Sequence, residues 1–172
     1  MIRCDDKSEI PGLIRNVCMT MLGHARQEEV SLLLGTAAVE SHLVHRRQFG
    51  GGPARGLCQM EPNTARDIFE NYLQYRAERF RGLVRTWLDT EEDVQFRVPS
   101  YDELERDLEA YDDFAFAMAR IHYLRVPDSI PNTISEQAAY WKEFYNTSAG
   151  AGTVEKYMEA WEECECEDLL VD

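Results

Sequence analysis

Apolar residues recur at spacings of three and four positions along most of this chain, a pattern typical of helices that bury one face. The sequence contains no run in which β-branched residues alternate with polar ones, which is the usual mark of a strand. It therefore predicts an all-α fold of about six or seven helices. The 172 residues suit one domain, and a composition of 44% hydrophobic and 29% charged residues is that of a globular protein with a sizeable core.

End signals place the expected helices along the chain. Gly23 ends the first helix, and the second is apolar nearly all round, with small residues at 35–38 that permit close packing. The capping-box spacing of Ser100 with Glu103 starts a later helix, and a similar pair at 133 and 136 starts another. The expected helices cover residues 9–23, 28–42, 63–88, 101–124, 134–147 and 154–161.

Acidic residues dominate the end of the chain. Between Glu155 and Asp172, eight acids accompany one base, Lys156, so this segment contributes −7 to a net charge of −14. We interpret residues 161–172 as a solvated or disordered acidic C-terminal tail, which follows a single domain over 1–160 with a helical insert near 70–111. The alternative is that the acidic surface docks a basic partner. A body this acidic repels nucleic acid and anionic membranes, so neither is an expected partner.

The first residues, MIRCDDKSEIPGLIR, lack the basic and then apolar segments of a secretory signal. No apolar run approaches the roughly 18–20 residues that span a bilayer. We therefore expect synthesis in the cytoplasm without a signal peptide, and no membrane insertion. The five cysteines are scattered and odd in number, which indicates free thiols. Cys164 and Cys166 could hold a soft metal but have no partner pair, so no metal site is expected.

Glu40 stands in an apolar helical run, within the stretch AAVESHLVHRRQFGGGPARGLCQMEPNTA that spans residues 37–65. Burial raises the pKa of a carboxyl because the charged form loses its solvation. A glutamate with a raised pKa holds a proton near neutral pH and can donate it as a general acid. The structural alternative is an ion pair between Glu40 and Arg46, Arg47 or Arg55, and the residues alone leave both interpretations open.

A glycine-rich loop follows Glu40, and it lacks the GxGxxG and GxxxxGK[ST] patterns that hold nucleotide phosphates. Such a loop can instead lie along a cleft, where backbone amides and Gln59 reach a polar, uncharged ligand. Aromatic residues later in the chain either offer faces for sugar rings or fill the core: Tyr140, Trp141, Phe144 and Tyr145. For Trp141 and Phe144 we favour the core.

Three pieces of the sequence together resemble the lytic transglycosylase branch of the lysozyme superfamily, the soluble lytic transglycosylase type. The first is Glu40-Ser41, the second is the pattern GxAxGLxQMxPxTA over residues 52–65, and the third is YNTSAGAG over residues 145–152. The pieces occur in the family's order and cover residues 37–65 and roughly 138–158. The resemblance implies a lysozyme-like helical domain that acts on peptidoglycan glycan strands and uses neither a metal nor an organic cofactor.

The resemblance also implies roles for individual residues. Glu40 would be the single catalytic acid and base at the bond between N-acetylmuramic acid and N-acetylglucosamine, with the substrate's own acetamide stabilising an oxocarbenium-like transition state. Carried over to this chain, the resemblance gives Ser41 the role of orienting the Glu40 carboxyl and Gln59 that of contacting the sugar near the cleavage point. Tyr145 would bond Glu40 or the substrate, and Asn146 would set the loop that carries Tyr145. Gly56 would shape the cleft floor.

The chain departs from the family pattern at Cys58, where methionine is common, and in the basic, flexible segment RRQFGGG over residues 46–52. These departures leave open whether the enzyme is a hydrolase or a transglycosylase. Because peptidoglycan lies outside the cytosol, we expect a phage protein that is carried in a tail or baseplate or released at lysis. The alternative is a weakly active or inactive lysozyme-like structural protein of the phage particle, bound to other virion proteins through its acidic surface.

Overall fold

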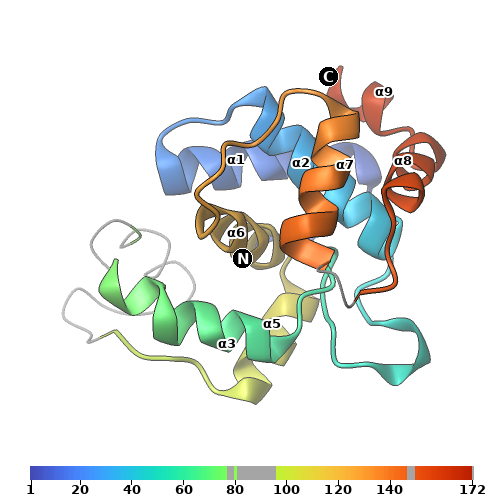
Figure 1. Cartoon of the computed structure of the whole chain (residues 1–172). Coiled ribbons are helices and arrows are strands. Elements are labelled where there is room, and N and C mark those ends of the chain that lie inside the picture. Colours follow the sequence, from blue (N-terminus) through green and yellow to red (C-terminus); the bar gives the residue numbers. More distant parts are fainter. Residues whose placement is uncertain (77–79, 81–95, 147–149, 172) are drawn as a thin grey trace.

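The computed structural model describes residues 1–76, 80, 96–146 and 150–171, and over these residues the chain is built from helices (Figure 1). The described part contains eight α-helices and no strand, which confirms the predicted all-α class. They are α1 (Ile10–Leu22), α2 (Gln27–Ser41), α3 (Pro62–Asn71), α5 (Tyr101–Ala110), α6 (Asp112–Leu124), α7 (Ile134–Trp141), α8 (Val154–Glu163) and α9 (Cys166–Leu170). Short helical turns accompany them: η1 (Lys7–Glu9), η2 (Phe49–Gly51), η3 (Leu73–Tyr75) and the π-helical turn η4 (Lys142–Asn146). None of these helices has both the length and the apolar character needed to cross a membrane.

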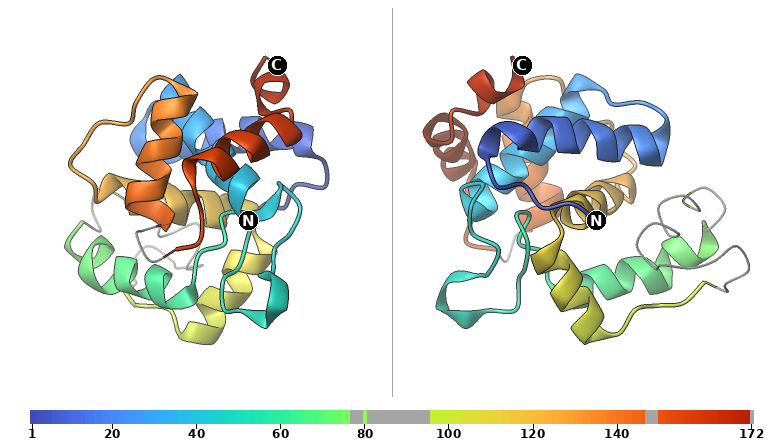
Figure 2. Two further views of the ribbon diagram at one scale, coloured as in Figure 1. Left: turned by 45° about the vertical axis from the view of Figure 1, so that its right-hand side comes forward. Right: turned by 180° about the vertical axis from the view of Figure 1, so that it is seen from behind.

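Helix α2 forms the centre of the domain and contacts α1, α6, α7, α8 and α9 (Figures 1 and 2). Its residues 29–38 are all buried, as expected for a helix that is apolar on most sides. Helix α8 packs closely on it at Gly35, where a Cβ atom would lie only 1.9 Å from the Tyr157 hydroxyl oxygen. The predicted close approach in this segment is therefore confirmed, and it holds α8 beside the helix that carries Glu40.

Two helices, α5 and α6, replace the single helix predicted over 101–124. The chain leaves the helical conformation at Tyr111, which has φ −127° and ψ 110°. The N-terminal segment pairs with the start of α6: the Asp112 N–H donates to the Ile2 carbonyl at 2.8 Å, and the Ile2 N–H donates to the Asp113 carboxylate at 2.9 Å. The prediction of one helix is wrong because these bonds join residues more than a hundred positions apart, and local spacing does not reveal them.

A second layer of the molecule consists of α3, α5 and the loop over residues 42–60, seen at the bottom of Figure 1. The helix predicted over 63–88 is shorter than expected at its described end, because α3 stops at Asn71 and the turn η3 follows. The part of that prediction over residues 77–79 and 81–88 lies outside the described residues.

The described end of the insert predicted near 70–111 belongs to the core. Helix α5 contacts both α3 and α6, and its Leu104 and Leu108 side chains have no exposed surface. Ser100 caps this helix in the predicted capping box, since its side chain accepts from the Glu103 N–H and the Glu103 carboxylate accepts from the Ser100 N–H.

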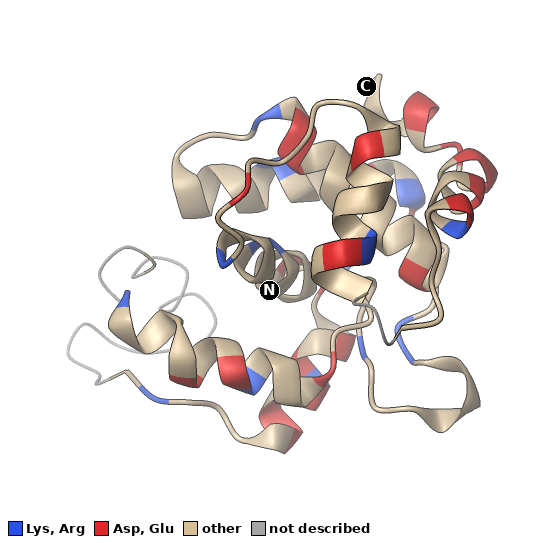
Figure 3. Ribbon diagram, viewed as in Figure 1, with Lys and Arg blue, Asp and Glu red and all other residues tan. Residues whose placement is uncertain are grey.

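The chain end predicted as a solvated or disordered tail is helical and packed over its described residues. Helix α8 runs across the expected boundary at 160/161, and α9 follows it; Trp161, Cys164 and Cys166 are buried. Arg15 of α1 donates to the Leu170 carbonyl at 3.3 Å, which ties α9 to the body. The prediction of a disordered tail is wrong because the apolar residues between the acids face inward, while the acids gather on the outer surface of α8 and α9 (Figure 3).

Candidate active site

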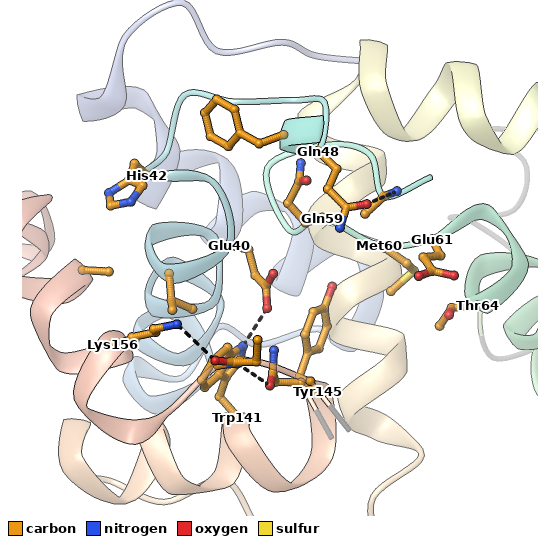
Figure 4. Close-up of a pocket in the computed structure, with 18 of the residues that line it drawn as sticks. Glu40, His42, Gln48, Gln59, Met60, Glu61, Thr64, Trp141, Tyr145 and Lys156 are labelled. Carbon is orange, nitrogen blue, oxygen red and sulfur yellow. Dashed lines mark hydrogen bonds between the residues drawn. The ribbon is translucent and has the colours of Figure 1, made fainter. Parts of the chain in front are cut away.

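A large open cleft lies between the C-terminal end of α2, the loop over residues 42–60, the start of α3, the turn η4 and helix α8. Its volume is about 1140 Å³, somewhat more than the roughly 300–1,000 Å³ of pockets for small ligands. Glu40, Gln59 and Tyr145 point into one common space in this cleft, and a dashed line joins Glu40 to Trp141 (Figure 4). The size and open form suit an extended ligand such as a polymer.

Glu40 is held in the last turn of α2, with its carboxyl in the cleft and most of its surface covered. The indole N–H of Trp141 donates to Glu40 Oε1 at 3.1 Å. Burial raises the pKa of Glu40 to about 7, and the bond from Trp141 acts against that rise because it favours the carboxylate. Near neutral pH, a large fraction of Glu40 therefore carries a proton that a ligand in the cleft can reach.

The ion-pair alternative for Glu40 is wrong. Each of the three nearby arginines binds an acid on α5 or α6 instead: Arg46 with Asp112 at 2.7 Å, Arg47 with Glu109 at 2.7 Å, and Arg55 with Glu105 at 2.5 Å. These pairs anchor the loop over residues 42–60 to α5 and to the start of α6. Their arrangement leaves the Glu40 carboxyl with an indole donor rather than a cation, so its charged form is not stabilised by a guanidinium.

Gln59 lines the cleft, as predicted, and its backbone has a positive φ of 46° that is uncommon for this residue type. Its side-chain amide donates to the Gly56 carbonyl at 2.8 Å and to the His45 carbonyl at 3.2 Å. The loop itself therefore fixes the position of Gln59. A backbone held in such a conformation by several bonds is typical of functional loops.

Tyr145 and Asn146 also line the cleft, on the π-helical turn that continues α7 directly after Trp141. The Tyr145 hydroxyl donates to the Cys58 carbonyl at 2.8 Å, so its proton goes to the cleft loop rather than to Glu40. The Asn146 side-chain oxygen accepts from the Gly152 N–H at 3.2 Å. Both residues thus tie η4 to neighbouring segments, and π-helical turns are frequent at functional sites.

Two of the expected site residues do not face the cleft. The Ser41 hydroxyl donates to the Ala37 carbonyl of its own helix at 2.8 Å, and the residue is 2% exposed. Gly56 is buried at a φ of 75°, and a Cβ atom there would lie 2.4 Å from the Leu108 carbonyl oxygen. The structure therefore gives Ser41 a packing role in place of the expected contact with the Glu40 carboxyl. Gly56 was expected to shape the cleft floor; it packs against α5 and does not line the cleft.

The structure adds residues that sequence reasoning missed. Trp141 was expected in the core and is only 1% exposed, yet it also bonds Glu40. His122 of α6 lines the cleft and bonds the Phe144 carbonyl through Nε2 at 3.0 Å, so Nε2 carries the proton. Burial lowers the pKa of His122, which favours the neutral ring. No spacing in the sequence links either residue to Glu40, since α2, α6 and α7 are brought together by packing alone.

The remaining aromatic candidates pack together away from the cleft. The rings of Tyr140 and Phe144 lie 4.7 Å apart, and the Tyr140 hydroxyl donates to the Asp128 carbonyl at 3.0 Å. Phe49, which the sequence did not single out, lines the cleft on the loop over residues 42–60.

Comparisons of the chain with protein-family models, with curated proteins and with solved structures find no match. Among the described residues, no group of three or more His, Cys, Asp or Glu side chains is arranged to hold a metal ion. In the cleft itself, a shielded, partly protonated carboxyl faces an open groove that also contains two glutamines, an asparagine and exposed acids.

Proposed function

We propose that this protein is a lytic transglycosylase or lysozyme-type glycosidase that cleaves the bond between N-acetylmuramic acid and N-acetylglucosamine in peptidoglycan. One observation carries the proposal: the Glu40 carboxyl lies in a cleft of about 1140 Å³ and has its pKa raised to about 7. A general acid needs a proton near working pH and access to the bond that breaks, and Glu40 has both.

The sequence resemblance gives independent support, because its three pieces meet at one place. Glu40, Gln59 and Tyr145 come from segments far apart in the chain, and all three line the same cleft (Figure 4). If the likeness in three short patterns arose by chance, the three segments would not be expected to meet in one cleft. Fold alone does not fix activity, so these side chains, rather than the all-α architecture, support the proposal.

The proposed reaction begins with transfer of the Glu40 proton to the glycosidic oxygen. The bond between that oxygen and the anomeric carbon then breaks, and the leaving sugar departs as an alcohol while positive charge develops on the remaining ring. Glu40, now a carboxylate, takes a proton from the nucleophile that attacks the anomeric carbon. If the nucleophile is the sugar's own 6-hydroxyl, the product is a 1,6-anhydro end; if it is water, the product is a reducing end.

A second candidate function is that of a lysozyme-like structural protein of a phage tail or baseplate, with little or no activity. The acidic surface of α8 and α9 favours it, since a net charge of −14 hinders free diffusion into an anionic cell wall (Figure 3). Docking in a particle would overcome that repulsion by raising the local concentration of the protein at the wall. The acidic face would then bind other virion proteins.

The test compares the parent protein with Glu40→Gln on purified peptidoglycan. Glutamine keeps the size of the side chain but has no acidic proton, so we expect the rate of sugar release to fall by roughly a hundredfold or more. Glu162→Gln serves as the matched control, because Glu162 is exposed on α8 and does not line the cleft. Mass spectrometry of the released sugars separates anhydro ends from reducing ends.

Equal activity of the parent and Glu40→Gln would overturn the assignment of Glu40. A parent protein that does not cleave peptidoglycan but is found in purified phage particles would support the structural candidate instead.

A further inference from the structure

We propose that Phe49 forms a sugar-binding subsite at the edge of the cleft, where one face of its ring stacks on a pyranose of the glycan strand. This inference rests on the proposed function and specifies how the cleft holds a polysaccharide away from Glu40. Aromatic side chains bind ligands that combine apolar and polar faces, and the C–H face of a pyranose ring is such a surface.

The exposure of Phe49 distinguishes it from the other aromatic residues of the cleft. Its side chain is 76% exposed, whereas Trp141 is 1% exposed and the Tyr145 ring packs against Tyr123 at 5.4 Å. Large exposed apolar side chains elsewhere in the described part of the chain, such as Tyr75 at 73% exposure, lie outside the cleft. Phe49 therefore combines an open ring with a position on the cleft wall.

Hydrogen bonds and ion pairs hold the loop that carries Phe49 in one conformation, and this fixes the position of the ring. The Gln48 N–H donates to the Ala54 carbonyl at 3.2 Å, and the Ala54 N–H donates to the Gln48 side-chain oxygen at 3.3 Å. Arg47 and Arg55 form an antiparallel bridge at the base of the loop, and both bind acids of α5. A preorganised loop loses little conformational entropy when a ligand binds to it.

The contacts that the Phe49 ring makes within the protein leave one face of the ring open to a ligand. The His45 ring packs on Phe49 in an edge arrangement, with centroids 4.6 Å apart and planes at 62°. This contact orients the phenyl ring but does not cover it, as the 76% exposure shows. Gln48 and Gln59 line the same part of the cleft. The Gln59 amide nitrogen is bonded to the Gly56 and His45 carbonyls, and the Gln48 side-chain oxygen accepts from the Ala54 N–H. The Gln59 side-chain oxygen and the Gln48 amide nitrogen are therefore the groups suited to the hydroxyl and acetamide groups of an N-acetylated sugar.

The experiment measures binding without cleavage, in a Glu40→Gln background. The probe is soluble peptidoglycan glycan strands freed of their stem peptides, and isothermal titration calorimetry gives the Kd. Covering one face of a phenyl ring buries about half of its apolar area, so we expect Phe49→Ala to raise the Kd roughly tenfold. Phe49→Trp keeps a stacking surface and should bind as the background protein does. Tyr75→Ala removes an equally exposed aromatic outside the cleft and should also leave the Kd unchanged.

The outcomes separate this inference from the proposed function. If the background protein binds the strands and Phe49→Ala binds them equally well, the subsite is overturned while a glycan-binding cleft stands. If the background protein does not bind the strands, the proposed function fails and the subsite fails with it. Loss of affinity in Tyr75→Ala as well as Phe49→Ala also overturns the subsite, because the effect would not be specific to the cleft.

Discussion

Glu40 experiences two opposing influences, and their balance sets the pH at which it can act. Burial disfavours its charged form, whereas the indole N–H of Trp141, 3.1 Å from Oε1, favours it. With a pKa of about 7, Glu40 loses its proton as the pH rises through neutrality, so the rate of the proposed reaction should decline there. The tryptophan is thus a positioning residue that also limits how far the pKa rises.

Replacing Trp141 by phenylalanine should show how much the indole N–H lowers the pKa of Glu40. Trp141→Phe keeps an aromatic ring in the core but removes the N–H, so burial acts on Glu40 without opposition and its pKa rises further. We expect the alkaline limb of the profile of kcat/KM against pH to move up by about half to one pH unit. Trp161→Phe is the matched control, since Trp161 is buried on α8 and does not line the cleft. A limb that stays in place, or moves to lower pH, would show that the indole does not tune Glu40.

The packing of α8 on α2 depends on the absence of a side chain at Gly35, which lies one turn or so before Glu40. A Cβ atom there would sit 1.9 Å from the Tyr157 hydroxyl oxygen and 2.4 Å from the ring carbon that bears it. Tyr157 has no exposed surface and cannot simply swing into solvent. We expect Gly35→Ala to lower the free energy of unfolding by about 1–3 kcal/mol, measured by urea denaturation.

Gly12→Ala, on the neighbouring helix α1, should change the free energy of unfolding in the opposite direction to Gly35→Ala. Gly12 lies in α1, and a Cβ atom there would meet nothing within 4 Å. Alanine has the higher helix propensity, so this change should raise the free energy of unfolding by about 0.5–1 kcal/mol. If both glycine variants are stabilised, α8 does not pack on α2 as described.

Local sequence signals account for most helices but for only part of the site. The ends of α1 and α2, the capping box at Ser100 and the importance of Glu40 all follow from residues within a few positions of each other. The break at Tyr111 does not, because it depends on pairing with the N-terminal segment. The donor from Trp141 to Glu40 is equally hidden, since the spacing of a buried tryptophan is the same whether or not its N–H meets a carboxylate.

The acidic end of the molecule illustrates a different limit. Counting charges predicts a solvated tail, and the acids are indeed exposed, yet the apolar residues between them hold α9 against α1 and α2. Composition therefore indicates what lies on the surface but not whether the backbone is ordered. Because Glu159 and Glu163 also line the cleft, this acidic face borders the path of any ligand that enters it.

The net charge of −14 should make cleavage of intact cell walls increase with salt. Wall polymers that carry phosphate or carboxylate groups repel an acidic protein, and this repulsion reaches roughly 30 Å at 0.01 M ionic strength but only about 8 Å at 0.15 M. Over that interval we expect the initial rate of sugar release from whole walls to rise roughly threefold or more. Peptidoglycan stripped of its anionic polymers is the control, and its cleavage should change little. Rates on whole walls that fall with salt, while the stripped material is unaffected, would mean that the protein binds those polymers through a cationic patch rather than being repelled by them.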